Sequence, residues 1–368
     1  MAFETRTWLV LHVLVLFVTC FMQHCFVNGQ TPPVPCLFVF GDSLSDNGNS
    51  NNLLTNAKAN YVPYGVDFPR GTTGRFTNGR TAIDIIGELL GISDFIPPFA
   101  NIVGSDILKG ANYASGAAGI RAETGKHMGA NIEMGLQVAN HRVIVSQIVA
   151  RLGGLPQAQQ YLKQCLYYVN IGSNDYINNY YLPRHPTYTT SRNYNPEEYA
   201  QVLINQASGY LQDLRESGAR KFVLVGIGQI GCTPFSIAKA NQGTQGCVEK
   251  YNADALIFSL KLRSLVDQLN GINLDSKYIF VNSTAGSIDS SLGFTVLDKA
   301  CCLPRSSDGM CVPNSRPCLN RNEYAFYDAI HPTSAVNNLT ALTSYDSTLA
   351  PETTSPMDIK RLAMLSIS

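Results

Sequence analysis

Short apolar runs recur along the chain, and each of them ends at glycine, asparagine or serine. They cover residues 36–40, 111–115, 166–171, 221–227 and 278–282. Strands that are apolar at nearly every position are buried on both faces, which is typical of a parallel sheet covered by helices. The pattern therefore predicts a sheet of about five parallel strands.

Amphipathic helical segments separate these runs. The clearest covers residues 196–217, where Asn195 can cap the helix, Pro196 suits its first turn and Gly218 ends it. Further helices are expected at residues 79–90, 133–151, 248–269 and 355–366. Strands that alternate with helices predict a three-layer α/β/α fold with a doubly wound sheet. The polar stretch 47–60 and the cysteine-rich stretch 301–318 are expected to be long loops on this fold.

The first thirty residues differ in character from the rest. Arg6 precedes a short, interrupted apolar run, and small residues near Gly29 close the segment. This order is typical of a secretory signal peptide, whereas a transmembrane anchor would need about 20 apolar residues in one run. We expect cleavage of residues 1–29, which leaves residues 30–368 as a single domain that is secreted to the extracellular space or cell wall. Two Asn-X-Ser/Thr sequons are glycosylation candidates on this route, Asn282 and Asn338.

The charge balance argues against two classes of partner. The chain has 27 basic and 27 acidic residues and a formal net charge of zero. Such a surface gives no electrostatic reason to expect nucleic acid or an anionic membrane as a partner.

The cysteines indicate disulfides. Of the ten cysteines, Cys20 and Cys25 lie in the signal segment, and the other eight are an even number in a chain headed for an oxidising compartment. We expect Cys232 to pair with Cys247 across a loop rich in glycine and glutamine. Two further bonds are expected within one group of four, whose pairing stays open: Cys301, Cys302, Cys311 and Cys318.

A serine and a histidine stand in settings that suit acyl chemistry. Ser43 follows the first predicted strand in Gly41-Asp-Ser-Leu, at the carboxyl end of the sheet, where α/β folds bind ligands. Only His331, among the histidines after the signal segment, has an acid three residues before it, which is Asp328. That acid can hold one imidazole nitrogen and leave the other free as a base. Each fragment taken alone is too common to identify a site.

Two further strand ends supply hydrogen-bond donors. Gly116 follows the run that ends at residue 115, and a glycine there allows a backbone N–H to approach a reacting oxygen. Asn174 follows the run 166–171, and its amide can donate a second hydrogen bond. Donors aimed at a developing oxyanion are usually the largest catalytic contribution in such enzymes. Together with Ser43 and His331, these residues predict an acyl-transfer site.

The motifs resemble those of a known superfamily. Four of them are similar, in the same order, to the four sequence blocks of the SGNH hydrolases: Gly41-Asp-Ser-Leu, Gly116, Gly172-Ser-Asn-Asp and Asp328-X-X-His331. Five longer stretches resemble plant GDSL esterase/lipases, and they start at Val39, Arg75, Gly231, Phe326 and Pro356. The resemblance covers nearly all of the chain after residue 29. Two positions depart from the family pattern, since Tyr327 stands where tryptophan is frequent and Ala117 where a second glycine is common.

The resemblance implies a flavodoxin-like SGNH hydrolase fold and an esterase without a cofactor, acting on small-molecule or polymer-bound acyl esters. Ser43 would be the nucleophile, His331 the base and Asp328 its partner. The Ser43 N–H, the Gly116 N–H and the Asn174 side chain would form the oxyanion hole. Two alternatives stay open. The same site could pass the acyl group to a sugar or lipid hydroxyl, or the chain could be a ligand-binding wall protein that has lost turnover.

One glycine-rich sequence could indicate a nucleotide cofactor, against the expectation of none. Gly226-Ile-Gly-Gln-Ile-Gly231 follows a strand and matches the dinucleotide-binding fingerprint. That fingerprint requires a helix directly after the first glycines, whereas Cys232-Thr-Pro follows here. A glycine-rich loop beside the site is the better interpretation. No His-Glu-X-X-His sequence and no closely spaced cysteine–histidine pair indicates a metal site.

A bond between Cys36 and Cys165 is expected from the catalytic arrangement. Ser43 and Asn174 must reach the same carbonyl group, so their strands should be neighbours that end at the same level. Cys36 lies seven residues before Ser43, and Cys165 lies nine before Asn174. Neighbouring strands are about 4.8 Å apart, within the range of roughly 4.4–6.8 Å that disulfides need between Cα atoms. Two buried free thiols are the alternative.

Overall fold

The computed structural model describes residues 33–367, except residues 183–184, 187, 241–245, 286–287 and 289. The expected signal peptide lies outside the described residues. The chain from Val34 onward forms one compact unit. Among the residues described, no helix is both long and apolar enough to cross a bilayer.

The central sheet has six strands in the order β2-β1-β3-β4-β5-β8. The first five are parallel, and β8 is antiparallel to β5. The strands are β1 (Leu37–Gly41), β2 (Gly110–Asn112), β3 (Leu166–Asn170), β4 (Lys221–Val225), β5 (Lys277–Val281) and β8 (Thr354–Ser355). The five parallel strands are those expected from the apolar runs. The sixth, β8, is too short to leave a pattern in the sequence.

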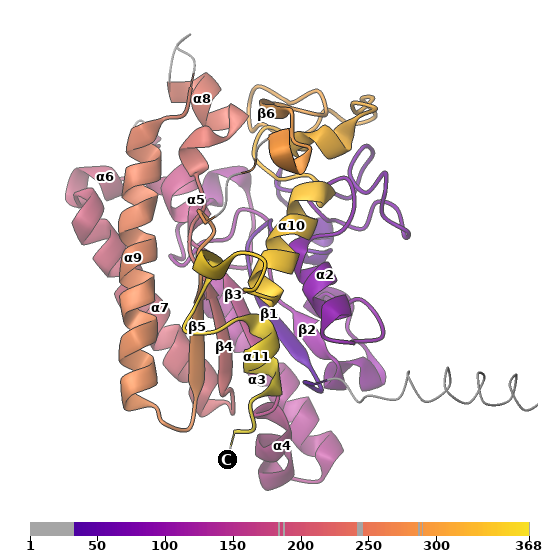
Figure 1. The fold of residues 1–368 in the computed structure, drawn as a ribbon, viewed down its shortest axis with the longest axis vertical. Helices are drawn as coiled ribbons and strands as arrows, with labels where there is room; N and C mark the ends of the chain where they lie inside the picture. Colours follow the sequence, from indigo (N-terminus) through magenta and orange to yellow (C-terminus); the bar gives the residue numbers. More distant parts are fainter. Residues whose placement is uncertain are drawn as a thin grey trace, which may run out of the picture. The chain divides into compact units, whose positions relative to one another are not determined.

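Helices cover both faces of this sheet (Figure 1). One face carries α3 (Met134–Leu152), α4 (Leu155–Leu162), α7 (Pro196–Glu216) and α9 (Glu249–Ile272), and the other carries α2 (Ala82–Leu89), α10 (Ser334–Tyr345) and α11 (Ile359–Met364). Along β1, Phe38 and Phe40 enter the core under α3, whereas Leu37 and Val39 enter the core under α2. Both faces are therefore apolar, and the predicted three-layer α/β/α fold is confirmed.

Smaller elements complete the fold. They are α5 (Ser173–Asp175), α6 (Thr190–Asn193), α8 (Pro234–Ala240) and a two-stranded parallel sheet of β6 (Val296–Ala300) and β7 (Tyr324–Phe326). One π-helical segment covers Tyr176–Tyr180. Short 3-10 helices cover Asn49–Asn52, Phe99–Asn101, Gly104–Leu108, Lys126–Met128, Ile230–Cys232, Ser290–Leu292, Arg321–Glu323 and Pro351–Thr353.

The five expected helices are present, with ends that shift by a few residues. The helix expected at 79–90 begins at Ala82 because Thr81 and Asp84 form a capping box there. Helix α10 was not expected, because half of the residues that it buries are polar, among them Asn337 and Ser344. The buried face of this helix is therefore not marked by a continuous series of apolar residues in the sequence.

Four disulfides cross-link the described chain. The register pairs Leu37 of β1 with Leu166 of β3, so the preceding Cys36 and Cys165 are neighbours, and they are bonded with Cα atoms 4.8 Å apart. Cys232 is bonded to Cys247. In the group whose pairing the sequence left open, the bonds are Cys301–Cys318 and Cys302–Cys311.

Candidate active site

Ser43 lies in the turn that directly follows β1. The Asp42 carbonyl oxygen accepts a hydrogen bond from the N–H of Asp46 at 2.9 Å, which closes the turn that contains Ser43. Gly41 allows this turn to lie close to β3, because a Cβ at this position would lie only 2.8 Å from the Asn170 carbonyl oxygen. The close packing of this turn against β3 therefore requires a glycine at position 41.

The loop after β7 holds an acid and an imidazole in one tight turn. Asp328 Oδ1 accepts hydrogen bonds from the N–H groups of Ile330 at 2.8 Å and His331 at 2.7 Å. Asp328 Oδ2 lies 2.7 Å from His331 Nδ1, and His331 Nε2 lies 2.7 Å from Ser43 Oγ. All three side chains are buried. The fold thus brings Ser43 to the Asp328–His331 turn across 288 residues of sequence.

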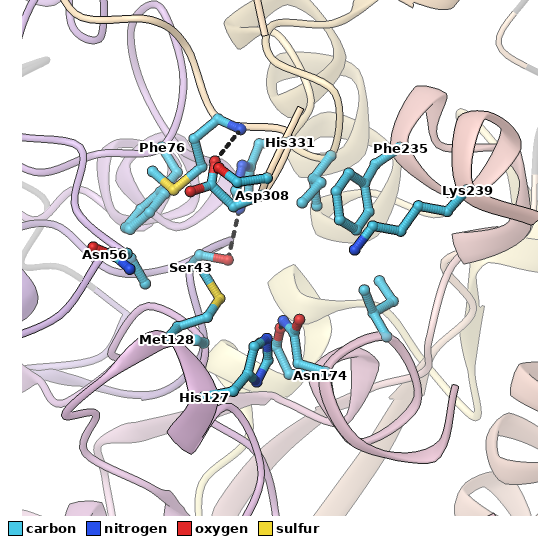
Figure 2. Close-up of a pocket in the computed structure, with 17 residues that line it drawn as sticks. Ser43, Asn56, Phe76, His127, Met128, Asn174, Phe235, Lys239, Asp308 and His331 are labelled. Atoms are coloured by element: carbon cyan, nitrogen blue, oxygen red, sulfur yellow. Dashed lines mark hydrogen bonds between the residues drawn. The ribbon is translucent and has the colours of Figure 1, made fainter. Parts of the chain in front are cut away.

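A cavity of about 240 Å³ opens beside Ser43 and His331 (Figure 2). Its apolar wall includes Phe76, Met128, Ile177, Phe235, Met310 and Ile330. Its polar wall includes Asn56, His127, Asn174, Asn178, Lys239 and Asp308. The side chains of His127 and Lys239 point into the same space as Ser43 (Figure 2). A mixed wall of this kind suits an ester, which has an apolar body and two polar oxygens.

Asn174 stands at the start of α5, directly after β3, and lines the cavity. Its Nδ2 donates to the Ala118 carbonyl oxygen at 3.0 Å, and its Oδ1 accepts from Asn178 Nδ2 at 2.6 Å. These two bonds fix the orientation of the amide. An amide nitrogen carries two protons, so one remains for a group in the cavity.

Gly116 does not have the environment expected of an oxyanion donor. Its N–H donates to Asp46 Oδ2 at 3.0 Å and to Ser50 Oγ at 2.9 Å, so this donor is already occupied inside the protein. A Cβ at Gly116 would lie 2.8 Å from both the Ala57 carbonyl oxygen and the Phe76 ring. The expectation that the Gly116 N–H faces the reacting oxygen was therefore wrong, and the glycine serves close packing instead.

Two buried carboxylates organise the loops around the cavity. Asp46 accepts hydrogen bonds from the N–H groups of Gly48, Asn49 and Gly116. Asp175 binds the N–H of Ile120 at 2.7 Å, along with the Arg121 N–H and the Thr124 hydroxyl. Burial raises the pKa of Asp175 to about 6 in spite of these donors. Both acids tie the loop after β2 to the turns that carry Ser43 and Asn174.

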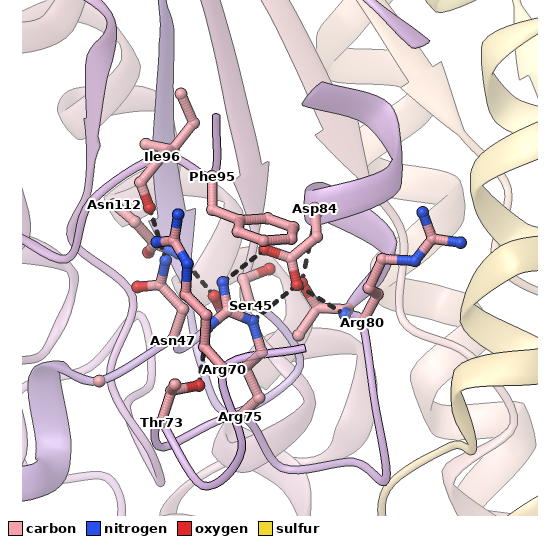
Figure 3. A network of polar contacts seen from close by, with 12 residues as sticks. Ser45, Asn47, Arg70, Thr73, Arg75, Arg80, Asp84, Phe95, Ile96 and Asn112 are labelled. Carbon is pink, nitrogen blue, oxygen red and sulfur yellow. Dashed lines mark hydrogen bonds and ion pairs between the residues drawn. The ribbon is translucent and has the colours of Figure 1, made fainter. Parts of the chain in front are cut away.

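An ion pair anchors the segment that packs on His331. The Arg75 guanidinium binds Asp84 with two hydrogen bonds, of 2.7 Å and 2.6 Å, and Thr73 with a third (Figure 3). Both partners of the ion pair are almost fully buried. The next residue, Phe76, packs its ring 5.0 Å from the His331 ring. Breaking a buried ion pair is strongly destabilising, so this pair holds Phe76 in place.

Sequence reasoning assigned no role to several residues at this site. His127 and Met128 lie in the 3-10 helix Lys126–Met128, and Lys239 lies in α8. All three are outside the recognised motifs, and no local signal marks them. Tyr64 donates a hydrogen bond to Asp328 from 264 residues away. Because such contacts depend on long-range folding, a single sequence contains no pattern that would have indicated them.

The glycine-rich sequence after β4 packs against the start of α9. The Gly231 N–H donates to Asn252 Oδ1 at 2.8 Å, and a Cβ at Gly231 would lie 2.2 Å from the Val248 carbonyl oxygen. Within the described part of the chain, no group of three or more histidine, cysteine or acidic side chains could hold a metal ion.

Comparison with known proteins places the chain in a family. Residues 37–342 match the family described as GDSL-like Lipase/Acylhydrolase. Three Arabidopsis thaliana proteins are similar over most of their length. GDSL esterase/lipase At1g29670 is 46% identical over 98% of this chain and 100% of the relative, and At1g29660 is 45% identical over 98% and 99%. GDSL esterase/lipase At4g18970 is 46% identical over 91% of this chain and 94% of the relative. The chain therefore belongs to the plant GDSL esterase/lipase family, within the SGNH hydrolases.

Proposed function

We propose that the protein is a secreted serine esterase that hydrolyses carboxylic esters through an acyl-Ser43 intermediate. As a member of its family the chain is a carboxylic ester hydrolase. The observation that carries the finer assignment is the unbroken hydrogen-bond chain from Asp328 through His331 to Ser43, which ends beside a cavity. This arrangement is that of a nucleophile, a general base and an orienting acid.

In the proposed reaction, His331 Nε2 takes the proton of Ser43 Oγ as this oxygen attacks the ester carbonyl carbon. Asp328 holds the Nδ1 proton, so that Nε2 is the free nitrogen, and it stabilises the imidazolium that forms. The tetrahedral intermediate collapses as the imidazolium protonates the leaving alcohol. Water then attacks the acyl-serine by the same proton transfers, which releases the acid and restores Ser43.

The oxyanion hole in this proposal has three donors. They are the Ser43 N–H, the Asn174 side chain and the Ala117 N–H, which replaces that of Gly116. Neither backbone N–H has a hydrogen-bond partner among the described residues. Ala117, with a left-handed φ of 59°, lines the cavity with Ser43 and Asn174. These features support a site that can stabilise negative charge on the carbonyl oxygen.

Asn174→Ala is expected to lower kcat by about 10²–10³ with little change in KM, because one oxyanion donor acts mainly in the transition state. Steady-state kinetics with nitrophenyl butyrate measure both constants. Asn56→Ala is the matched control, since Asn56 also lines the cavity but makes no hydrogen bond to Asn174, and this variant should keep the wild-type kcat. An Asn174→Ala effect confined to KM would mean that Asn174 only binds substrate.

Two histidines line the cavity, and only His331 is assigned as the base. Burial, with His185 and Lys239 nearby, lowers the pKa of His127 to about 4, so His127 is neutral wherever the triad works. His127→Gln should therefore keep kcat within a few-fold and leave the acid limb of the pH–rate profile unchanged. His331→Gln should abolish turnover. A displaced acid limb in the His127 variant would contradict the assignment of the base.

The cavity supports a short acyl group as substrate. Its volume of about 240 Å³ lies below the range of about 300–1,000 Å³ that is usual for drug-sized ligands. A long acyl chain would have to extend beyond it. Small-molecule esters and acetylated polymers both meet this limit, because only the acyl group and the adjacent alcohol carbons need to enter.

An acyltransferase is the alternative within the same site, and it would use the same triad with an alcohol acceptor in place of water. A binding protein without turnover is the alternative of another class. A fluorophosphonate probe tests the proposal, because an activated serine forms a covalent adduct with it. We expect one adduct per chain, at Ser43. Absence of labelling in folded protein would favour the binding protein.

Secretion is part of the proposal. We propose that residues 1–29 are removed as a signal peptide, which leaves residues 30–368 as one extracellular or cell-wall hydrolase domain. The four disulfides support this route, because such bonds persist in oxidising compartments. Asn282 and Asn338 are proposed glycosylation sites, and both are partly exposed.

A further inference from the structure

Asp328 has one more partner than a catalytic triad requires. Its carboxylate accepts two backbone N–H groups on Oδ1 and the imidazole of His331 on Oδ2. The Tyr64 hydroxyl donates a fourth hydrogen bond, to Oδ2 at 2.5 Å. Tyr64 and Asp328 are both fully buried, at 0% exposure. The same carboxylate oxygen therefore accepts hydrogen bonds from the His331 imidazole and from Tyr64, which lies 264 residues earlier in the sequence.

We propose that Tyr64 is a positioning residue of the triad, whose hydroxyl, oriented by the Cys311 N–H, fixes Asp328 and sets the basicity of the acid–imidazole pair. This inference rests on the proposed esterase mechanism and adds a role that the sequence motifs do not include.

The direction of each hydrogen bond follows from chemistry. The Cys311 N–H can only donate, and it lies 3.0 Å from the Tyr64 oxygen. The single phenolic proton is then left for Asp328, which can only accept in its ionised form. Burial and the charge of Asp328 raise the pKa of Tyr64 well above its ordinary value, so the phenol keeps this proton. The result is a chain of two hydrogen bonds, from the Cys311 N–H to the Tyr64 oxygen and from the Tyr64 hydroxyl to Asp328, which we call the relay.

The relay is anchored by a disulfide and a set of rings. Cys311 is bonded to Cys302, whose N–H donates to the Tyr327 carbonyl oxygen at 2.8 Å, directly before Asp328. The Tyr64 ring meets the rings of Tyr61, Phe76 and Tyr327 edge-on, at centroid distances of 5.3 to 6.2 Å. The loop closed by the disulfide thus contacts the catalytic acid on two sides, through Tyr327 and through Tyr64.

The charge on Oδ2 determines how Tyr64 would act. A donor to a carboxylate disperses its charge and lowers its affinity for a proton. Without the Tyr64 hydroxyl, more negative charge would remain on Oδ2, and Asp328 would attract the imidazolium more strongly. Among the described residues, the other ionisable groups in electrostatic contact with Asp328 or His331 include Asp42, Tyr61 and Tyr327, and Arg305 and Asp308 face Tyr61. None of these groups is altered by the substitution Tyr64→Phe.

Tyr64→Phe tests the relay, because it removes the hydroxyl and keeps the ring. We expect kcat to fall by about tenfold with KM unchanged, and the acid limb of the kcat/KM profile to move up by about half a pH unit. Tyr61→Phe is the matched control, since its hydroxyl donates to the Cys311 carbonyl oxygen at 2.9 Å and makes no hydrogen bond to Ser43, Asp328 or His331. This control should keep the wild-type rate and profile.

Rates are expressed per site that reacts with the fluorophosphonate probe, so loss of folded protein does not count as loss of activity. A second readout needs no turnover: the low-field proton NMR signal of the imidazole Nδ1–H should shift in Tyr64→Phe and not in Tyr61→Phe. Identical rates, profiles and signals in Tyr64→Phe and wild type would overturn the inference. Failure of the esterase proposal would give a different result, because wild-type protein would then neither hydrolyse esters nor react with the probe.

Discussion

Ser43→Ala is expected to lower kcat for nitrophenyl acetate or butyrate by about 10⁵–10⁶, a loss comparable to that of removing the His331 imidazole. The reason is that Oγ is the atom that forms the acyl bond, and His331 Nε2, 2.7 Å away, has no other proton to take. The variant should also lose fluorophosphonate labelling completely. Steady-state kinetics and mass spectrometry of the labelled protein measure the two effects.

The variant should remain folded, because Ser43 contributes one small hydroxyl at a turn that backbone hydrogen bonds close. Its melting temperature should stay within a few degrees of wild type. Ser45→Ala is the matched control, since this buried serine lies in the same turn and outside the triad. If Ser43→Ala hydrolysed these esters at the wild-type rate, Ser43 would not be the nucleophile and the proposed mechanism would fail.

Asp328→Asn is expected to lower kcat by about 10⁴. The buried carboxylate accepts the His331 Nδ1 proton, which leaves Nε2 free to take the serine proton. An asparagine amide that turned its NH₂ group toward Nδ1 would favour the other tautomer, with the proton on Nε2. The histidine could then no longer act as the base. The loss should appear in kcat more than in KM, because Asp328 does not line the cavity.

Asp308→Asn provides the control for this change of charge. Asp308 lines the cavity and binds Arg305, but it makes no contact with the triad. We expect kcat within a few-fold of wild type for this variant. An Asp328→Asn enzyme that retained more than a tenth of wild-type activity would show that the acid is not needed to orient His331. The proposed role of Asp328 in the mechanism would then be wrong.

The sequence determined the features that depend on local pattern. The apolar runs identified the five parallel strands, since a strand buried on both faces cannot carry polar alternation. The spacing of Asp328 and His331 already indicated a turn in which the acid reaches the imidazole. Nearly equal distances along two neighbouring strands, seven and nine residues, were enough to suggest the Cys36–Cys165 bond, because the offset of a strand from its neighbour is constant along the sheet.

Only the tertiary structure decided which donors face the cavity and what holds the acid in place. The Gly116 N–H turns toward Asp46 and Ser50, and the direction of a peptide group depends on backbone angles that residue identity leaves open. Tyr64 reaches Asp328 across 264 residues, through a loop whose position depends on the packing around the Cys302–Cys311 bond. A sequence motif records which residue types occur in order along the chain. The direction of each hydrogen bond and each contact between distant loops is fixed only when the whole core has packed.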